Sequence, residues 1–296
     1  MTVFPVTRSS TLDADGAAAV LALAGRAEDL DGVAPLNEAA VTALLDPGAD
    51  THLHLSVLED GGLVGHLLAT QDVDGWQAEL VVEPHHRRRG VGSSLIGAYV
   101  DAAGEASLRI WAHGDLPGAA AVARVHGFEP VRTLLKLARP TDGPTPAPRA
   151  PAGTTTRTFV PGQDEDALLA VNARAFAHHP EQGRMDAHDL AQRTGSDWFD
   201  PAGLFLVEDA EDGRLLGFHW TKVEDGVGEV YVVGVDTGAQ GRGLGTYLTA
   251  VGLHHLTSEL ALPRVDLYVE GDNAPALAVY RAQGFVESSR DVLYRR

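Results

Sequence analysis

The sequence of 296 residues contains no cysteine. Disulfides, cysteine-ligated zinc, iron–sulfur clusters and a cysteine nucleophile are therefore all excluded. Basic residues are also scarce, because 23 Lys and Arg stand against 41 Asp and Glu, a formal net charge of −18. Binding to nucleic acid or to an anionic membrane surface depends on Lys and Arg, so we expect neither partner.

Long apolar runs are missing as well. No segment approaches the ~18 apolar residues that mark a membrane-spanning helix, and the first residues show no basic stretch leading into an apolar one. At 44% hydrophobic and 22% charged residues, the composition is that of a globular protein. We therefore expect a cytoplasmic protein.

A proline-rich segment divides the chain. Residues 140–153 contain five prolines without any apolar periodicity, and such a segment continues neither a helix nor a central strand. It is typical of a semi-rigid linker. We expect an N-terminal domain over residues 1–139, a linker over 140–153 and a C-terminal domain over 154–296, two pieces of ordinary domain size.

The two pieces carry the same pattern in the same order. Residues 89–92 read Arg-Gly-Val-Gly, and residues 242–245 read Arg-Gly-Leu-Gly. Further on, a glycine is followed after 13 residues by Gly-Phe in both pieces, at Gly114 and at Gly271. Two matches in one order indicate an internal duplication.

Each piece places β-rich runs before its glycine turn and a helical period after it. The expected strands are 53–58, 63–70, 76–82 and 108–111 in the first piece, and 205–208, 215–222, 229–235, 265–269 and 292–295 in the second. Helices are expected from residues 91 and 244 and over 275–283. The fold class is therefore α+β, with a mixed, mostly antiparallel sheet flanked by helices in each piece.

The glycine-rich turns, residues 87–92 and 240–245, each join a strand to a helix. Glycine lets the backbone approach a ligand, and N–H groups at a helix start point outward, so such a turn suits a phosphate group. Neither turn is a P-loop or a dinucleotide fingerprint. Arg87, Arg88 and Arg89 lie at a helix N-terminus, where each positive charge is unfavourable by ~0.3–1 kcal/mol because of the helix dipole. We interpret the three arginines as cations that a ligand anion neutralises.

These motifs resemble the GCN5-related N-acetyltransferase (GNAT) superfamily. The second piece holds Q-x-x-G-x-G at residues 240–245 and N-x-x-A-x-x-x-Y-x-x-x-G-F at 273–285. The resemblance covers both pieces and implies two tandem domains of this superfamily. It also implies acetyl-CoA as cosubstrate, with the pyrophosphate on the turn and the pantetheine arm between two splayed strands.

The resemblance assigns acetyl-CoA contacts in both pieces. In the first they are Leu80, Val81, Val82, Arg88, Arg89, Gly90, Val91, Gly92 and Ser93. In the second they are Val233, Gly234, Val235, Gln240, Gly241, Arg242, Gly243, Leu244, Gly245, Thr246, Asn273, Ala274, Pro275, Ala276, Leu277 and Ala278. No metal is expected, because the pairs at 85–86, 178–179 and 254–255 are adjacent histidines, which do not face each other on a helix.

Acetyl transfer to an amine needs a base, donors for the oxyanion and an acid for the thiolate. The second piece offers Glu229 as the base, Tyr280 as the acid and a backbone N–H near Val235 for the carbonyl. Counting back from the glycine turn places Trp76 of the first piece at the position of Glu229. Glu79 lies three residues after Trp76, and an odd offset along a strand puts its side chain on the opposite face of the sheet. We therefore expect a catalytic C-terminal domain and a degenerate N-terminal copy that still binds CoA.

Residues 178–183, 218–223, 229–235 and 267–270 are similar to the mycothiol synthase family of actinobacteria, which is tandem and of this length. The resemblance implies acetylation of the cysteinyl amine of Cys-GlcN-Ins, the last step of mycothiol biosynthesis. The substrate-binding positions that it implies are Glu38, Glu181, Lys222, Glu229 and Tyr268. Carboxylates such as these accept hydrogen bonds from sugar hydroxyls.

Two other hypotheses stay open. A tandem acetyltransferase acting on another small amine, such as an aminoglycoside or polyamine, fits the acidic net charge. A non-catalytic acetyl-CoA-sensing module would bind CoA without turnover, but Glu229 together with Tyr280 favours an enzyme. We expect a monomer, because one chain supplies the two copies that single-domain relatives supply from two chains.

Overall fold

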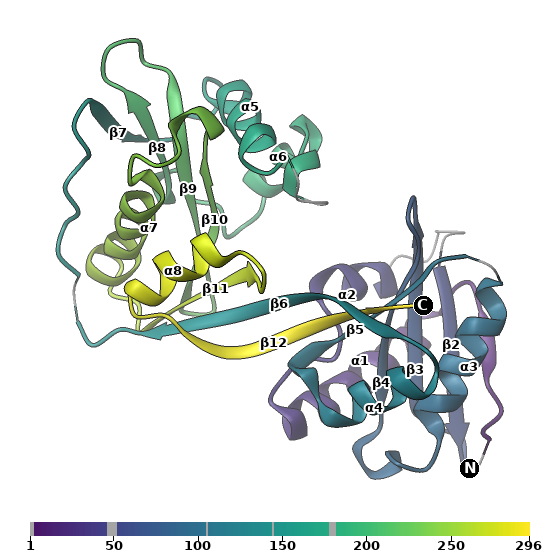
Figure 1. Ribbon diagram of the computed structural model, residues 1–296. Coiled ribbons are helices and arrows are strands. Elements are labelled where there is room, and N and C mark those ends of the chain that lie inside the picture. The colour runs from purple at the N-terminus through teal and green to yellow at the C-terminus, as the bar shows by residue number, and fades with distance from the viewer. Residues whose placement is uncertain (1–2, 46–51, 105, 144, 178–181) are drawn as a thin grey trace. The chain divides into compact units, whose positions relative to one another are not determined.

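The structure is a computed structural model that describes residues 3–45, 52–104, 106–143, 145–177 and 182–296. Its contacts divide the chain into two units (Figure 1). Unit 1 comprises Met1–Leu134 and Ser289–Arg296, and unit 2 comprises Leu135–Ser288. Each unit is α+β. None of the described helices is long and apolar enough to cross a membrane.

Unit 1 contains a mixed sheet in the order β1-β2-β3-β4-β5-β12. Neighbouring strands run antiparallel except β4 and β5, which run parallel. The elements are β1 (Thr7–Ser9), α1 (Ala14–Asp31), α2 (Glu38–Leu45), β2 (His52–Glu59), β3 (Gly62–Asp72), β4 (Gly75–Val82), η1 (Pro84–His86), α3 (Val91–Ala103), β5 (Leu108–Ala112), η2 (His113–Asp115) and α4 (Pro117–Val125). Strand β6 (Glu129–Pro140) then leads into unit 2.

Unit 2 repeats this plan, with strands in the order β6-β11-β10-β9-β8-β7 and a parallel pair between β10 and β11. The elements are β7 (Thr154–Thr158), α5 (Glu165–Ala175), η3 (Gln182–Arg184), α6 (Ala187–Thr194), η4 (Pro201–Gly203), β8 (Leu204–Asp209), β9 (Leu215–Glu224), β10 (Val227–Val235), η5 (Thr237–Ala239), α7 (Leu244–His254), the π-helical turn η6 (His255–Glu259), β11 (Arg264–Glu270) and α8 (Ala274–Ala282). Strand β12 (Val286–Arg295) then leads from unit 2 back into unit 1. The expected strands and helices are confirmed, although the last strand begins six residues before the expected 292.

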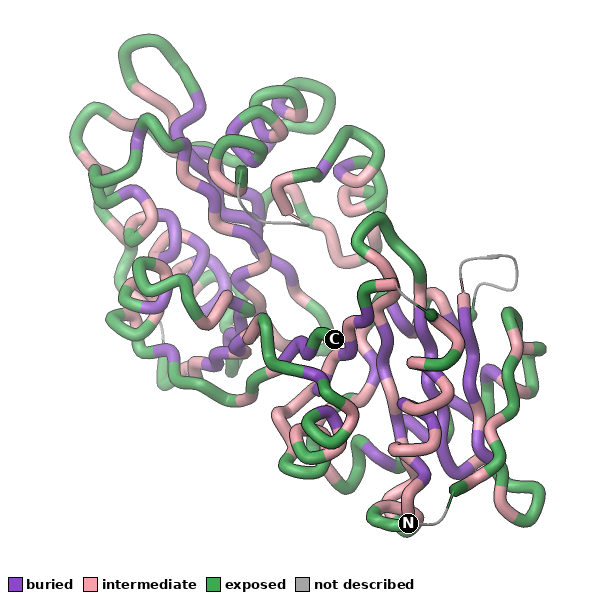
Figure 2. Tube along the Cα trace, turned by 45° about the vertical axis from the view of Figure 1, so that its right-hand side comes forward, coloured by how far each residue is buried: buried purple, intermediate pink, exposed green. Residues whose placement is uncertain are grey.

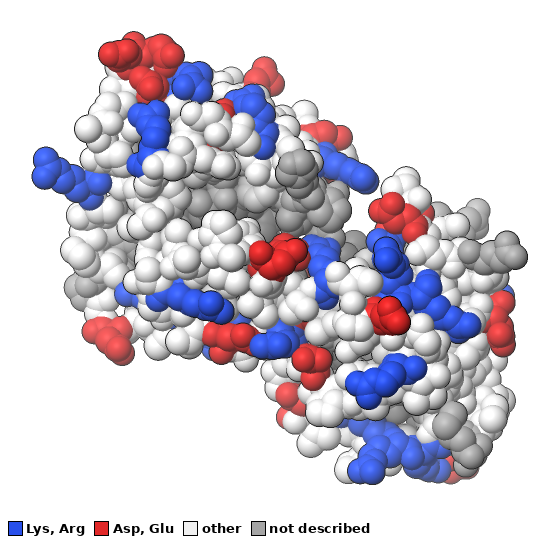
Figure 3. All heavy atoms as spheres, viewed as in Figure 1, with Lys and Arg blue, Asp and Glu red and all other residues white. Residues whose placement is uncertain are grey.

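Helices cover both faces of each sheet. In unit 1, α1 and α2 pack on Leu68 of β3, whereas α3 packs on the opposite face. In unit 2, α5 and α6 pack on the face that carries Trp220, and α7 packs on the other. Figure 2 shows the result as buried strands inside each unit and exposed loops around them. Acidic and basic side chains lie interspersed on the face viewed in Figure 3.

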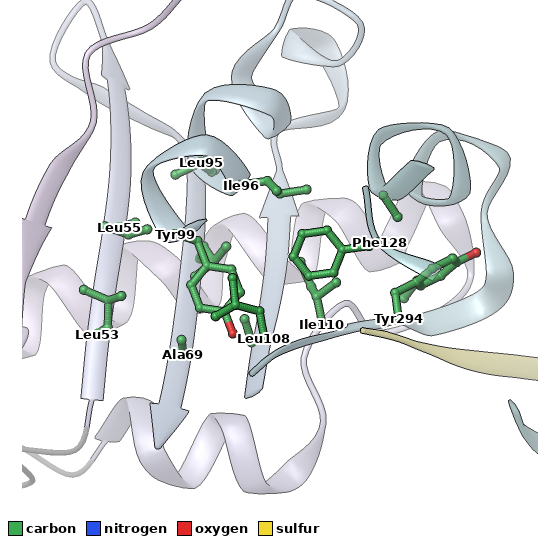
Figure 4. Close-up of a cluster of buried hydrophobic side chains, with 14 of the residues drawn as sticks. Leu53, Leu55, Ala69, Leu95, Ile96, Tyr99, Leu108, Ile110, Phe128 and Tyr294 are labelled. Atoms are coloured by element: carbon green, nitrogen blue, oxygen red, sulfur yellow. The ribbon is translucent and has the colours of Figure 1, made fainter. Parts of the chain in front are cut away.

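The core of unit 1 lies between its sheet and α3 (Figure 4). Leu95 and Tyr99 project from α3 toward the strands, and the Tyr99 hydroxyl donates to the carbonyl oxygen of Arg109 at 3.1 Å. Tyr294, from the end of the chain, lies in the same cluster as Phe128 and is buried. Because burying one such side chain is worth ~1.5–3 kcal/mol, the end of β12 is held in unit 1 by its apolar face.

A glycine at equivalent positions of the two units brings the helix after each turn close to the sheet. A Cβ at Gly65 of β3 would lie 2.5 Å from Cγ1 of Val91 in α3. A Cβ at Gly217 of β9 would lie 2.7 Å from the carbonyl oxygen of Gly234 and 3.0 Å from Leu248 in α7. Only glycine fits at both places, so the duplicated packing fixes where each turn sits.

Candidate active site

The turn of unit 2, residues 240–245, leads into a helix whose start no side chain caps. Gly241 and Gly243 both have φ of +77°, a conformation that favours glycine. Gly243 is the N-cap of α7, and no side chain caps that helix start. The first N–H groups of α7 are therefore available to a phosphate group.

In unit 1, the structure corrects the interpretation of the three arginines. Arg87 makes two 2.7 Å bonds to Asp31, and Arg89 donates to Glu59 at 2.7 and 3.1 Å. These two charges are neutralised within the protein and need no ligand. Among the residues that the structure describes, only Arg88 of the three lacks a carboxylate partner, and it adopts φ of +61°.

A cavity of about 790 Å³ opens beside the turn of unit 1. Of the expected CoA contacts, those that line it are Leu80, Val81, Val82, Arg88, Gly90, Gly92 and Ser93. Val91 is instead buried in the core, and Arg89 points to Glu59. The cavity also extends along β5, where Ile110 and Ala112 form part of the wall.

Both units have splayed parallel strands. Strands β4 and β5 pair from Trp76 to Ala78, and β10 and β11 pair from Gly228 to Val230. Beyond these residues the two parallel strands part. Leu80, Val81 and Val82 lie where β4 pairs only with β3, and Val233, Gly234 and Val235 lie where β10 pairs only with β9. In unit 1 the cavity lies where the strands part, with residues of both β4 and β5 in its wall.

The remaining expected contacts of unit 2 lie on α7 and α8. Thr246 is exposed on α7, and its carbonyl accepts a hydrogen bond from Gln283, just after α8, at 3.1 Å. Asn273 caps α8 by accepting from the N–H of Ala276. Of the other expected positions on α8, Ala274, Pro275 and Ala278 are exposed, Ala276 is half-buried and Leu277 is buried.

Glu229 lies in the paired part of β10, between Lys222 of β9 and Asp266 of β11. Burial raises the pKa of its carboxyl group, against the nearby Lys222 and Lys136, which lower it. A carboxylate whose pKa is raised is a stronger base, as general base catalysis near neutral pH requires.

Tyr280 lies on α8, with its ring 5.9 Å from that of Phe285 in an edge contact. It packs against the cluster that contains Val230 of β10, the neighbour of Glu229. Burial raises the pKa of Tyr280 to about 12, so the phenol stays protonated at neutral pH.

The expected substrate residues fall in three places. Lys222 is buried, forms a 2.9 Å ion pair with Glu224, and lies 5.2 Å from the centre of the Trp198 ring. Tyr268 is 47% exposed on β11, two residues after Asp266, and therefore shares a sheet face with Glu229 and Lys222. Glu38 is exposed in the first turn of α2, in unit 1. Glu181 and the pair at 178–179 lie outside the described residues.

Sequence reasoning missed three contributors to the environment of Glu229. Lys136 pairs with Asp266 at 3.2 Å and lies 5.4 Å from the centre of the Tyr268 ring. Its strand, β6, lies next to β11 in the sheet although it precedes β11 by more than a hundred residues. Trp198 lies in the irregular segment after α6. Lys136 lies between the buried Leu135 and Leu137, and Trp198 lies in a loop, so neither sequence position indicated which residues would be its neighbours in space.

The expected orientation of Glu79 is wrong. The register between β9 and β10 shifts between Val230 and Val232, which marks a β-bulge at Tyr231. The register between β3 and β4 has no such shift, and Glu79 lies opposite Leu68. The extra residue compensates for the odd offset, so Glu79 and Glu229 project from equivalent faces of their sheets, the faces covered by α1–α2 and α5–α6.

Among the residues that the structure describes, no group of three His, Asp or Glu side chains is arranged to hold a metal ion.

Two segments, residues 26–128 and 169–285, match the Acetyltransferase (GNAT) family. A mycothiol acetyltransferase of Thermomonospora curvata is 52% identical over 280 residues, covering 93% of this chain and 92% of that protein.

Solved structures of acetyltransferases have a similar fold. A GCN5-related N-acetyltransferase from Sphaerobacter thermophilus is similar with a TM-score of 0.76 at 25% identity, covering 99% of this chain and 96% of that one. A tandem GNAT protein from the clavulanic acid biosynthesis pathway has a TM-score of 0.68 at 18% identity, covering 99% and 98%. The two family matches confirm the duplication and the tandem α+β fold. The chain belongs to the acetyltransferase (GNAT) family and, within it, to the mycothiol acetyltransferases.

Proposed function

We propose that this protein transfers the acetyl group of acetyl-CoA to the cysteinyl amine of Cys-GlcN-Ins, with unit 2 as the catalytic unit and unit 1 as a CoA-binding unit without turnover. The observation that carries this proposal is the placement of Lys222, Glu229 and Tyr268 on one face beside the splayed strands of unit 2. These are residues that the resemblance to mycothiol acetyltransferases assigns to the acceptor. The 52% identity with a protein of that name supports the same substrate.

The residues of unit 2 divide the chemistry among them. Acetyl-CoA supplies the acetyl group as a thioester. Glu229 accepts a proton from the attacking amine, directly or through water, and its raised pKa strengthens it as a base. A cysteinyl α-amine has a pKa of ~7.7–8.0, so a fraction of it is neutral near pH 7 and only one proton must be removed during attack. Lys222 is placed to donate hydrogen bonds to acceptor oxygens.

Tyr280 acts on the leaving sulfur. Its pKa of about 12 means that it is a donor over the whole physiological range. A thiol has a pKa of ~8.5, well below that of Tyr280, so complete transfer of the phenolic proton to a thiolate is uphill. We infer that Tyr280 stabilises the developing thiolate by a hydrogen bond, and that the thiol is formed with a proton from solvent or from the protonated base.

Unit 1 has the cavity, the glycine turn and the splayed strands, but no catalytic tyrosine. The position that corresponds to Tyr280 is Ala123, which is buried. Glu79 is on the acceptor face, yet one of its oxygens accepts from the backbone N–H of Asn37 at 2.8 Å. These contacts support ligand binding without transfer in unit 1.

The test mixes the full chain with acetyl-CoA and Cys-GlcN-Ins and follows the product by mass spectrometry. The acceptor carries its own thiol, so N-acetyl and S-acetyl products have one mass and are separated by counting the free thiols that remain. We expect the N-acetyl product, with the thiol free. A polyamine and an aminoglycoside are offered in parallel, and faster acetylation of either would overturn the proposed substrate. Bound acetyl-CoA with no turnover on any amine would favour the sensing module.

A further inference from the structure

A buried cluster of charged side chains in unit 1 has no part in the chemistry above. His113, in the first position after β5, lies between two carboxylates: Nδ1 is 3.0 Å from Oδ2 of Asp291, and Nε2 is 3.3 Å from Oε1 of Glu79. Glu79 comes from β4, and Asp291 comes from β12, near the end of the chain. The His113 side chain is only 9% exposed.

Both carboxylates are fixed by backbone amides. The N–H of Asn37, just before α2, donates to Oε2 of Glu79 at 2.8 Å, and the N–H of Gly114 donates to Oδ1 of Asp291 at 3.0 Å. The indole of Trp111 also stacks on the imidazole, with 6.1 Å between ring centres. The imidazole is therefore held in one orientation before any ligand arrives.

This cluster borders the cavity of unit 1. His113 lines that cavity together with Ala112 and Trp111, and the glycine turn lines its other part through Gly90 and Gly92. Glu79 is the first residue of β4 beyond its pairing with β5, which ends at Ala78. An extended ligand whose phosphates lie on the glycine turn and whose other end runs between β4 and β5 therefore ends beside the Glu79–His113 pair.

One donor of His113 is poorly satisfied. Nδ1 bonds to Asp291, whereas Nε2 has only the ion-pair contact with Glu79 at 3.3 Å and no acceptor of good hydrogen-bond geometry among the described residues. Burial opposes the charge on the ring, but the two carboxylates outweigh it and raise the pKa of His113 to about 9, so Nε2 carries a proton at neutral pH. A buried donor without an acceptor is costly, which favours a ligand that brings one.

The protonated ring indicates which acceptor that is. The Nε2–H of an imidazolium donates to an oxygen lone pair. Two carboxylates already lie beside the ring, and a neutral oxygen adds no further negative charge there. The acceptor that fits is the carbonyl oxygen of an acyl thioester.

We propose that the Nε2–H of His113 hydrogen-bonds the thioester carbonyl of an acyl-CoA bound in unit 1, so that this unit selects acyl-CoA over free CoA. This inference rests on the proposed CoA binding of unit 1. Selection follows because only the acylated ligand offers a carbonyl at the end of the pantetheine arm. The donor differs from any in unit 2, where Glu270 corresponds to His113 and offers no N–H from its side chain.

The experiment measures binding to the full chain by calorimetric titration with acetyl-CoA, free CoA and S-ethyl-CoA, a thioether that lacks the carbonyl. We expect two binding events. In one of them acetyl-CoA should bind at least about tenfold more tightly than S-ethyl-CoA, the ratio expected for one hydrogen bond from a charged donor. With [1-¹³C]acetyl-CoA, the corresponding carbonyl resonance should be shifted downfield from that of the free ligand.

A matched pair of variants assigns the effect to His113. Glu79→Gln with Asp291→Asn removes both charges and keeps the imidazole, whereas the same pair with His113→Leu removes the donor without leaving a buried charge unpaired. The second should lose the preference for acetyl-CoA at every pH. The first no longer has the carboxylates that keep Nε2 protonated, so it should show the preference only at a pH low enough to charge the ring. If both variants fail to fold, the comparison of acetyl-CoA with S-ethyl-CoA in a protein changed at residues 240–245, in which only unit 1 binds, still decides.

The outcomes separate the two proposals. Two binding events with equal affinity for acetyl-CoA and S-ethyl-CoA in each would overturn the role of His113 and leave CoA binding by unit 1 intact. A single binding event, abolished by changes in residues 240–245, would overturn both. Persistence of the preference in the His113→Leu variant would also refute the assignment.

Discussion

Replacing Glu229 by Gln keeps the size of the side chain and its place between Lys222 and Asp266 on the sheet, but removes the base. General base catalysis is worth ~10²–10⁴ in rate, so kcat/KM should fall by that factor. At 1.36 kcal/mol for each factor of ten, this equals about 3–5 kcal/mol of lost transition-state stabilisation. The amide still accepts hydrogen bonds, so KM for the acceptor should change by less than kcat.

The pH profile provides an independent test of the same residue. Glu229 must be ionised to act, and burial raises its pKa above the usual glutamate value. Activity of the unchanged protein should therefore fall with decreasing pH through that raised pKa, in addition to the fall caused by protonation of the substrate amine near ~7.7–8.0. In Glu229→Gln only the limb of the amine should remain.

The assay is quenched-flow sampling with chromatographic measurement of CoA and product, because thiol reagents also react with the acceptor. Glu211→Gln is the matched control: Glu211 is exposed in the turn between β8 and β9, and its loss should leave turnover unchanged. Turnover of Glu229→Gln within about threefold of the unchanged protein would refute the assignment of the base. An equal fall in the Glu211→Gln control would mean that the loss is not specific.

Three further predictions follow from the structure. Tyr280→Phe should lower kcat by ~10–100-fold, the value of one hydrogen bond to a charged group, with unchanged thermal stability because the contact with Phe285 remains; a kcat within twofold of normal would contradict this role. The pKa of His113, raised to about 9, stabilises the folded state fully below the unfolded value of ~6.5, and this stabilisation is lost as pH rises through about 9. From the difference of about 2.5 pKa units, denaturant unfolding should show a loss of ~3 kcal/mol in the free energy of unfolding between pH 6 and 10, and this loss should be absent from the variant with His113→Leu, Glu79→Gln and Asp291→Asn. Gly252→Ala should lower the free energy of unfolding of unit 2 by ~1–3 kcal/mol or more, because its Cβ would overlap the ring of the fully buried His219. By contrast, Gly97→Ala in α3, where a Cβ meets nothing within 4 Å, should be neutral or stabilising; equal melting temperatures for the two variants would disprove this packing argument.

The sequence by itself determined the duplication, the α+β class and the place of each glycine turn. These features are local: a strand period, a turn and a helical period follow one another along the chain, and the repeat of that order needs no knowledge of distant contacts. The pattern of residues 240–245 and 273–285 was also sufficient to identify the family. Glu229 and Tyr280 were predicted as catalytic residues from their spacing to those motifs.

Only the tertiary structure decided what surrounds these residues. The face of Glu79 depended on a β-bulge at Tyr231 in the other unit, and one inserted residue is invisible to a count along the strand. Arg87 forms an ion pair with Asp31, and Arg89 forms one with Glu59. These partners lie 56 and 30 residues away in the chain.

The buried position of His113 likewise required the end of β12 to pair with β5 and bring Asp291 to it. Sequence patterns report the period and polarity of neighbours along the chain, whereas ion pairs and pKa values depend on neighbours in space. The sequence therefore determined which reaction to expect and where the ligand turn lies, and the fold decided which charged groups are free to take part.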